Sequence, residues 1–462
     1  MKSTNKAFQK KATRLFLFIT LCYSMTVGTM SWATESLGRL NLEQALTILE
    51  SHSPRIQKTQ SFIEETRWKK TEAFAAYYPT LTANANYLFD KRYLLTDVQL
   101  GAATTSIPAV IPTTNYSLTA QYLLFDGFAS TARYNGASAM EKSALAEGDW
   151  TRFQLKQEVS LLFYKALASQ ILKDVASANL ATLEDHLKDI NLFKKEGLST
   201  KYDVLRVEVQ VSEARSELLN ASDNIETSKG KLVETLGLDN FDGTLIGSLP
   251  TPTSLQQALS ATVIAKSIDS STAYDSQLFQ YRQDLTSLNY KIDSLQQMQN
   301  ATGRHWVPKL SLFGTWQSYN NRNDKWDDFN NFREAYQVGV NLSWSFFDGF
   351  ASTAKDHQSI EQKYQAESQL RALQLKTKQD FNLWKRKFNY FATIYQSRQN
   401  DIQKSMESVR LAKEGIRVGS RTNTDLLDAE AELYRAQAGA VNAQIGAIEA
   451  FYNLELTLGK SL

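Results

Sequence analysis

Two long stretches of the sequence carry hydrophobic residues at alternating steps of three and four positions. They cover 159–190 in the first half of the chain and 381–412 in the second. This spacing is typical of the seam of a coiled coil. No proline occurs between 113 and 249 or after 308, so the strongest helix breaker is absent from both stretches. The pattern predicts a long helix with an antiparallel return helix in each half, over 132–236 and 354–458.

Shorter amphipathic segments precede these helix pairs, at 42–78 in the first half and, less regularly, at 255–306 in the second. Stacked end to end, one short segment and one return helix match the length of a long helix. We therefore expect the helices to form the continuous wall of a tube.

Four other segments alternate between large apolar side chains and small or polar ones, with a period of two residues. They lie at 81–89, 116–124, 310–319 and 336–346. Each is about ten residues long, which is enough for a tilted strand to cross a bilayer. The alternation predicts two membrane hairpins, at 80–125 and 309–347, whose long connecting loops project outside the cell. A soluble hairpin with one face on a core is the alternative interpretation.

Four strands in one chain cannot close into a barrel. An open sheet edge within hydrocarbon leaves backbone groups without hydrogen-bond partners, at several kcal/mol each. Two chains would supply eight strands, a barrel filled by its own side chains, whereas three would supply twelve and leave a channel. The pattern therefore excludes a monomeric barrel and leaves the number of subunits open.

An internal duplication organises the chain. The octapeptide Phe-Asp-Gly-Phe-Ala-Ser-Thr-Ala occurs at 125–132 and again at 347–354, an offset of 222 residues. The same offset relates Gly197 to Gly419, Asp203 to Asp425, Leu205 to Leu427 and Glu208 to Glu430. A single register held over more than a hundred residues indicates a duplication. We expect a first repeat at 34–238, a linker rich in glycine and proline at 239–253, and a second repeat at 254–462.

The N-terminus resembles a secretory signal peptide, over residues 1–33. A basic region precedes a short apolar run, and Ser31-Trp32-Ala33 offers small residues for cleavage. A membrane anchor helix is the alternative, but the apolar run is shorter than the roughly 20 residues that span a bilayer. Cys22, the only cysteine, lies in this segment, so the mature chain is expected to have no disulfide and no cysteine metal site.

Charge and motifs exclude several classes of function. The net charge is +2 for the whole chain and −3 without the five basic residues of the signal segment, so no nucleic-acid partner is expected. We find no nucleophile elbow and no phosphate-binding loop, and the histidines have no metal-ligand spacing. An enzyme is therefore not expected, nor is a cofactor. A secreted coiled-coil scaffold is the alternative to a membrane pore, and a need for detergent during extraction would separate them. The histidines are His52, His186, His305 and His357.

The octapeptide stands where a predicted strand ends and a long helix begins. Gly127 and Gly349 can adopt backbone angles that other residues avoid. Asp126 and Asp348 supply oxygen acceptors for the unpaired amides of the helix start. We interpret the motif as a structural junction rather than as a contact with cargo.

With these features, the chain resembles the TolC family of outer-membrane efflux and secretion channels. The resemblance extends over 40–462 and rests on Leu-Glu-Gln-Ala-Leu at 42–46, Tyr-Pro-Thr-Leu at 78–81, both Phe-Asp-Gly segments and, above all, the stretch 418–429. It implies an α+β fold in which long antiparallel coiled-coil helices form a periplasmic tunnel below a trimeric, twelve-stranded barrel in outer-membrane lipid. It also implies an exit duct for small-molecule efflux or type I protein secretion, working with a periplasmic adaptor and an inner-membrane transporter.

The resemblance further assigns roles at the tips of the helix pairs. Arg421 would hold the periplasmic gate closed through Asp203, and Asp425 and Asp428 would form carboxylate rings at the constriction. These two acids are three residues apart and so share one helix face, and a ring of acids favours cations. The tips that would dock the adaptor comprise Gly197, Leu198, Val418 and Gly419. Nothing in the sequence separates efflux of small molecules from secretion of protein.

Overall fold

The computed structural model of the chain describes residues 38–89, 95–101, 103–108, 111–197, 199–261, 278–322 and 325–462. The expected signal segment, 1–33 with Cys22, lies outside the described residues. In the described part of the chain, no helix is both long enough and apolar enough to cross a membrane.

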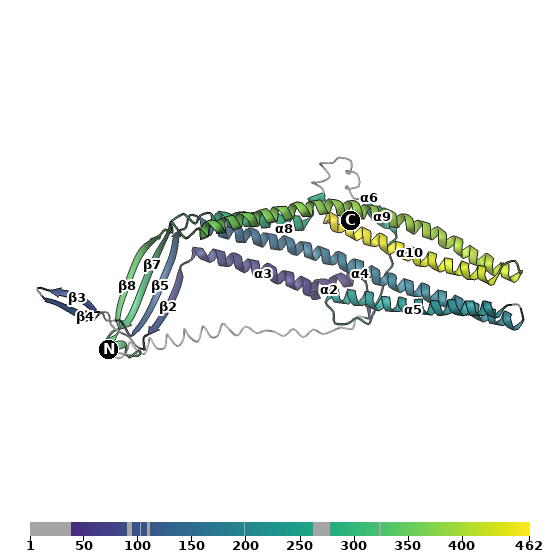
Figure 1. The fold of residues 1–462 in the computed structure, drawn as a ribbon, viewed down its shortest axis with the longest axis horizontal. Coiled ribbons are helices and arrows are strands. Elements are labelled where there is room, and N and C mark those ends of the chain that lie inside the picture. Colours follow the sequence, from purple (N-terminus) through teal and green to yellow (C-terminus); the bar gives the residue numbers. More distant parts are fainter. Residues whose placement is uncertain are drawn as a thin grey trace.

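Two antiparallel helix pairs form the long axis of the molecule (Figure 1). The first pair is α4 (Ala129–Lys195) with α5 (Lys201–Leu236), and the second is α9 (Ala351–Arg417) with α10 (Asn423–Leu458). Both long helices have 67 residues and both return helices have 36. At 1.5 Å per residue the long helices span about 100 Å and the return helices about 54 Å. The two pairs therefore repeat one architecture, with bounds within three residues of those that the hydrophobic spacing predicts.

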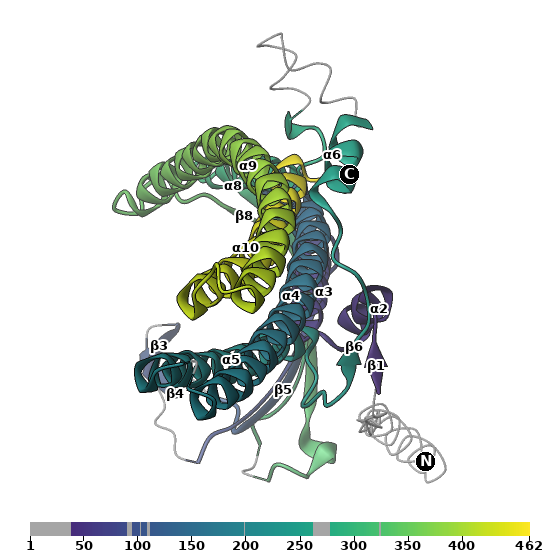
Figure 2. The same ribbon diagram turned by 90° about the vertical axis from the view of Figure 1, so that its right-hand side faces the viewer.

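Short helices pack along the part of each long helix that its return helix does not reach. In the first repeat these are α2 (Leu42–His52) and α3 (Pro54–Phe74), followed by the 3-10 turn η1 (Ala75–Tyr77). In the second they are α6 (Pro252–Ala261) and α8 (Gln283–Thr302). The segment expected as one helix at 42–78 is thus divided, because Ser53 is extended and Pro54 cannot continue the backbone hydrogen bonds. Helix α3 follows α5 along α4, and α8 follows α10 along α9, as expected for a tube wall (Figures 1 and 2).

The end of the molecule that is predicted to lie in a membrane is a four-stranded antiparallel sheet in the order β2-β5-β7-β8. Its strands are β2 (Thr80–Tyr87), β5 (Thr114–Phe125), β7 (Lys309–Asn320) and β8 (Arg333–Ser343). The pairing of β5 with β7 joins the hairpins of the two repeats into one sheet. Strand β8 ends three residues before the predicted limit, and Trp344 beyond it donates its indole N–H to the carbonyl of Trp306 at 3.0 Å.

The register places mainly large apolar side chains on one face of this sheet and mainly polar or small ones on the other. The cross-strand row Thr119–Thr315–Gln337 is polar, whereas the adjacent row Leu118–Trp316–Tyr336 is apolar. The apolar face is exposed: Tyr336 is 84% and Val338 74% accessible. No described part of the chain packs over these large apolar side chains. Their exposure is expected if lipid covers this face of the sheet.

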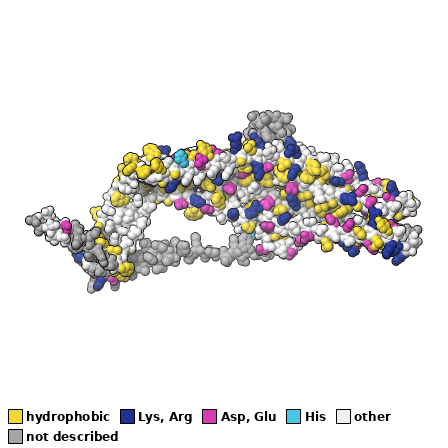
Figure 3. All heavy atoms as spheres, in the orientation of Figure 1, with side chains coloured by type: hydrophobic (Ala, Val, Ile, Leu, Met, Phe, Trp, Pro, Cys, Tyr) yellow, Lys and Arg dark blue, Asp and Glu magenta, His cyan; other side chains and the backbone are white. Residues whose placement is uncertain are grey.

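Two small additions complete the chain. The loop expected after β2 contains a hairpin of its own, β3 (Leu95–Leu100) with β4 (Ala103–Pro108). Strands β1 (Arg39–Leu40) and β6 (Thr244–Leu245) pair in parallel beside α2 and so connect the start of the first repeat to the linker. Figure 3 shows charged side chains of both signs spread over the helices, whereas hydrophobic ones gather where helices meet the sheet.

Candidate functional site

The turns between the paired helices form two free tips at the end opposite the sheet (Figure 1). Gly197 and Gly419 occupy equivalent positions there, with φ of +76° and +72°. A side chain added at either glycine would meet nothing within 4 Å, and Val418 is 77% exposed. The surface expected to dock an adaptor is therefore open. Leu198, its fourth expected member, lies outside the described residues.

Each return helix begins with the same hydrogen-bonded cap. The Asp203 carboxylate accepts from the backbone N–H of Thr200 at 2.9 Å and its hydroxyl at 2.6 Å, and Asp425 accepts from Thr422 at 2.8 and 2.9 Å. These bonds from Thr200 and Thr422 hold the pKa values of both carboxyls below their usual range. Two of the three expected gate acids thus also fix a helix start, which the spacing of threonine and aspartate three residues apart could have signalled.

The single chain does not join Arg421 to Asp203. Within the described residues these two form no ion pair, and the Arg421 side chain instead lies over Gly415 in α9. Asp428 is exposed, one turn beyond Asp425 on the same side of α10. The chain therefore brings two of the expected gate residues together on one helix face and leaves Arg421 apart from Asp203.

The first two turns of α10 contact both helix pairs. Leu426 and Ala429 pack against Ala412 of α9. Leu427 faces the other way, into an apolar cluster of the first repeat: Leu183, Ile190, Val204, Val207, Val211 and Ala214. Arg206 of α5 adds a hydrogen bond from its guanidinium to the Thr424 hydroxyl at 3.0 Å. The tip of the second repeat is thereby docked on the coil of the first, with Asp425 and Asp428 on the remaining face.

A buried polar cluster lies next to this apolar contact. His186 of α4 and Glu430 of α10 are 7% and 4% exposed, and Nδ1 of the imidazole lies 3.2 Å from Oε2 of the carboxylate. The other ring nitrogen, Nε2, contacts Oδ1 of Asn423, and the Lys413 ammonium of α9 lies 3.5 Å from Oε1 of Glu430. Sequence patterns do not predict this cluster, because its two central residues are 244 positions apart.

The octapeptide forms the same junction twice. Asp126 accepts hydrogen bonds from the backbone N–H and the hydroxyl of Ser130, and Asp348 does so from Ser352. Gly127 and Gly349 have φ near +70°, and so has the phenylalanine after each. The carboxylates of Asp126 and Asp348 therefore cap the long helices where the chain turns out of the sheet.

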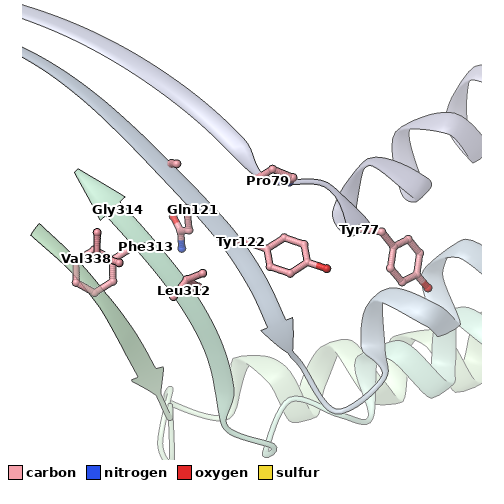
Figure 4. A pocket seen from close by; sticks show the side chains of 9 residues that line it. Tyr77, Pro79, Gln121, Tyr122, Leu312, Phe313, Gly314 and Val338 are labelled. Atoms are coloured by element: carbon pink, nitrogen blue, oxygen red, sulfur yellow. The ribbon is translucent and has the colours of Figure 1, made fainter. Parts of the chain in front are cut away.

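One hollow opens on the apolar face of the sheet (Figure 4). Its volume is about 540 Å³, and Tyr77, Pro79, Tyr122, Leu312 and Val338 line it. Small cross-strand neighbours, Ala120 and Gly314, leave the space. Since the hollow lies on the face that lipid is expected to cover, it is not a candidate cargo site. Elsewhere in the described residues, no group of three or more His, Cys, Asp or Glu is placed to hold a metal ion.

Comparison with known proteins identifies the family. The family model of the outer membrane efflux proteins matches residues 45–238 and 276–460, more than half of the chain. The chain belongs to the outer membrane efflux protein family. This membership confirms the resemblance to TolC-like channels and places the protein in the outer membrane. The two matched ranges fall one in each repeat.

Known proteins resemble the chain at low sequence identity, one by its sequence and two by their solved structures. A protease secretion protein of Dickeya chrysanthemi, PrtF, is 20% identical over 270 residues, which are 57% of this chain and 55% of PrtF. The match thus spans about half the length of that relative. The outer membrane protein VceC of Vibrio cholerae has a TM-score of 0.71 at 16% identity, over 91% of this chain and 96% of VceC. The open state of the Neisseria gonorrhoeae channel MtrE has a TM-score of 0.70 at 16% identity, over 91% and 89%. The predicted α+β fold of helical tunnel and membrane strands is confirmed.

Proposed function

We propose that the protein is the subunit of a homotrimeric duct that carries small molecules or secreted protein across the outer membrane. The observation that carries this proposal is a membrane-length sheet with one exposed apolar face and two free edges, continuous with long helices that end in open tips. A periplasmic adaptor would bind the tips, and an inner-membrane transporter would supply the energy.

The sheet supports an assembly of three chains. In the described residues β2 and β8 each pair with one strand, so both edges need a partner in hydrocarbon. Three copies give a twelve-stranded barrel that leaves a channel, whereas two give an eight-stranded barrel that its own side chains fill. The polar row Thr119–Thr315–Gln337 would then face the lumen.

The duplication supports a neighbouring copy at the helices as well. Leu427 is 5% exposed against the first repeat, but its counterpart Leu205 on α5 is 49% exposed. Glu208 is likewise exposed whereas its counterpart Glu430 is buried. A second chain would cover the start of α5 in the way that the first repeat covers the start of α10. Other large apolar residues on α5 remain uncovered in the single chain: Tyr202, Val209 and Leu219.

The gate would lie at the assembled tips. Three copies of Asp425 and Asp428 bring six carboxylates around the axis, an arrangement that favours cations. Arg421 and Asp203, which are apart in the single chain, would meet across subunits and hold the tips closed. The relative PrtF is described as a protease secretion protein and the matching family as outer membrane efflux proteins, so protein and small molecules both remain candidate cargoes.

Reconstitution of the purified mature chain tests this function. Native mass spectrometry in detergent should give three copies, and addition to a planar lipid bilayer should give long-lived, cation-preferring conductance steps. A chain that is soluble without detergent and forms no conductance would refute the duct and favour the coiled-coil scaffold.

A further inference from the structure

We propose that the buried pair His186–Glu430 is a pH-dependent latch that holds the tip of the second helix pair on the first and so keeps the duct closed in acid. This inference rests on the proposed channel function. It concerns residues that lie outside the expected gate set, and it assigns His186 and Glu430 as positioning residues for α10.

Both ring nitrogens of His186 face hydrogen-bond acceptors. Nδ1 lies 3.2 Å from the Glu430 carboxylate, and Nε2 contacts the amide oxygen of Asn423. A neutral imidazole has one donor and one acceptor nitrogen, so it can satisfy only one of these oxygens. The doubly protonated ring donates to both. The geometry therefore selects the imidazolium form.

The surrounding charges act in opposite directions, since the Glu430 carboxylate favours the charged ring and the Lys413 ammonium opposes it. On α9, Lys413 is half exposed and lies 3.5 Å from Oε1 of Glu430, which accepts no hydrogen bond from any described residue. On α5, Arg206 is engaged with Thr424 of α10, and on α4 the neighbour Asp185 pairs with Lys188. Two cations therefore face the Glu430 carboxylate, and His186 is the buried one. When His186 loses its proton, the buried Glu430 carboxylate keeps only the half-exposed Lys413 as a cationic partner among the described residues. A buried charge that is incompletely paired destabilises the folded state.

The direction of the pH dependence follows from the shift. Burial and, to a smaller extent, the Lys413 ammonium oppose the charge on His186, but the hydrogen bonds to Glu430 and Asn423 and the carboxylate charge outweigh both and raise the pKa of His186. A group whose pKa is raised by folding stabilises the folded state fully when the pH is below its ordinary pKa. That contribution is lost as the pH rises through the pKa of the folded state. The latch is thus tight in acid and weakens in alkali.

The latch lies where it can control opening. Its two sides belong to different repeats, α4 and α10, next to the Leu427 contact that docks the tip. Release of His186 frees the first turns of α10, which carry Asp425 and Asp428. The duplication places Ser408 at the position equivalent to His186, so the repeat-related contact has no titrating imidazole. The pH response would belong to the contact within a chain.

Single-channel recording in planar bilayers, from about pH 5 to about pH 9, tests the latch. The ratio of open to closed time should rise with pH, by up to about tenfold per pH unit for each proton released. His186→Gln, which cannot become charged, should give a flat profile in this range, and Glu430→Gln should flatten it too. His186→Lys, which restores a cation, should recover much of the acid closure, whereas the exposed His357→Gln should keep the wild-type profile.

Hydrogen exchange in detergent separates the two proposals. After correction for the intrinsic rate, amides at 423–430 should lose protection in wild type as pH rises, and in His186→Gln they should be unprotected throughout. A wild-type profile that does not depend on pH, or an unchanged slope in His186→Gln, overturns the latch. Absence of conductance with a pH-dependent exchange at α10 would overturn the channel function and leave the latch standing.

Discussion

Replacement of Leu427 by alanine is expected to undock the tip of α10. The side chain is 5% exposed and packs against residues of both α4 and α5, so the two helices cannot easily close around the space it leaves. Removal of such a buried leucine costs about 2–5 kcal/mol. If about 3 kcal/mol of this acts on docking, the ratio of undocked to docked tips rises by about two orders of magnitude, since 1.4 kcal/mol is tenfold.

Single-channel recording at constant pH measures this change as a longer open time, and hydrogen exchange reports it as lost protection at 183–190 and 423–430. Leu427→Met keeps the volume and should cost less than about 1.5 kcal/mol, so its open time should change by about tenfold at most. Leu205→Ala alters the exposed counterpart and should weaken association of subunits rather than docking within a chain. Equal open times and equal protection in wild type and Leu427→Ala would refute the docking role.

Further predictions concern charge, pH and backbone conformation. Asp428→Asn should lower the cation preference in reversal-potential measurements more than Asp425→Asn, because Asp428 is exposed whereas the Asp425 carboxylate is engaged in the helix cap; equal effects would contradict this assignment. Burial raises the pKa of Glu455 to about 7 from 4.5, so the folded chain retains a proton that the unfolded chain releases. Stability should therefore fall as pH rises from about 5 to about 8, by up to about 3 kcal/mol. At about pH 8 the Glu455→Gln variant should have a higher melting temperature than wild type. If its melting temperature depends on pH as that of wild type does, Glu455 is not the group responsible. Gly237→Ala should lower the melting temperature, since φ is +77° and a side chain there meets backbone atoms at 2.8 Å. Gly230→Ala, within the helix that Gly237 ends and with free space around it, should raise stability by up to about 1 kcal/mol, and similar changes for both glycines would refute the reasoning.

Local periodicity was sufficient to locate the main elements. The bounds of α4, α5, α9 and α10 lie within three residues of those expected from the hydrophobic seam, because a coiled-coil seam is a property of consecutive residues. The same holds for the strands, whose alternation reflects the two faces of one sheet. The division of 42–78 at Ser53 and the hairpin β3–β4 were not predicted, since the first depends on one proline within an otherwise regular pattern and the second on a loop without strong alternation.

The candidate gate was only partly visible in the sequence. Asp425 and Asp428 share a face because their spacing fixes it, and the structure agrees with that expectation. The capping role of Asp203 and Asp425 was missed, although the threonine three residues before each one signals it. The relation of Arg421 to Asp203 stays a prediction about the assembled tips.

The sequence by itself determined the duplication and the helix and strand positions, because each follows from spacing along the chain, and the same spacing predicts that more than one chain is needed. Only the tertiary structure decided which copy of a duplicated residue is buried. Leu205 and Leu427, like Glu208 and Glu430, occupy equivalent positions of the duplication, yet only the second of each pair is covered by the other repeat. Burial is set by neighbours from distant segments, as His186 is for Glu430, and no local period encodes which distant segments will meet.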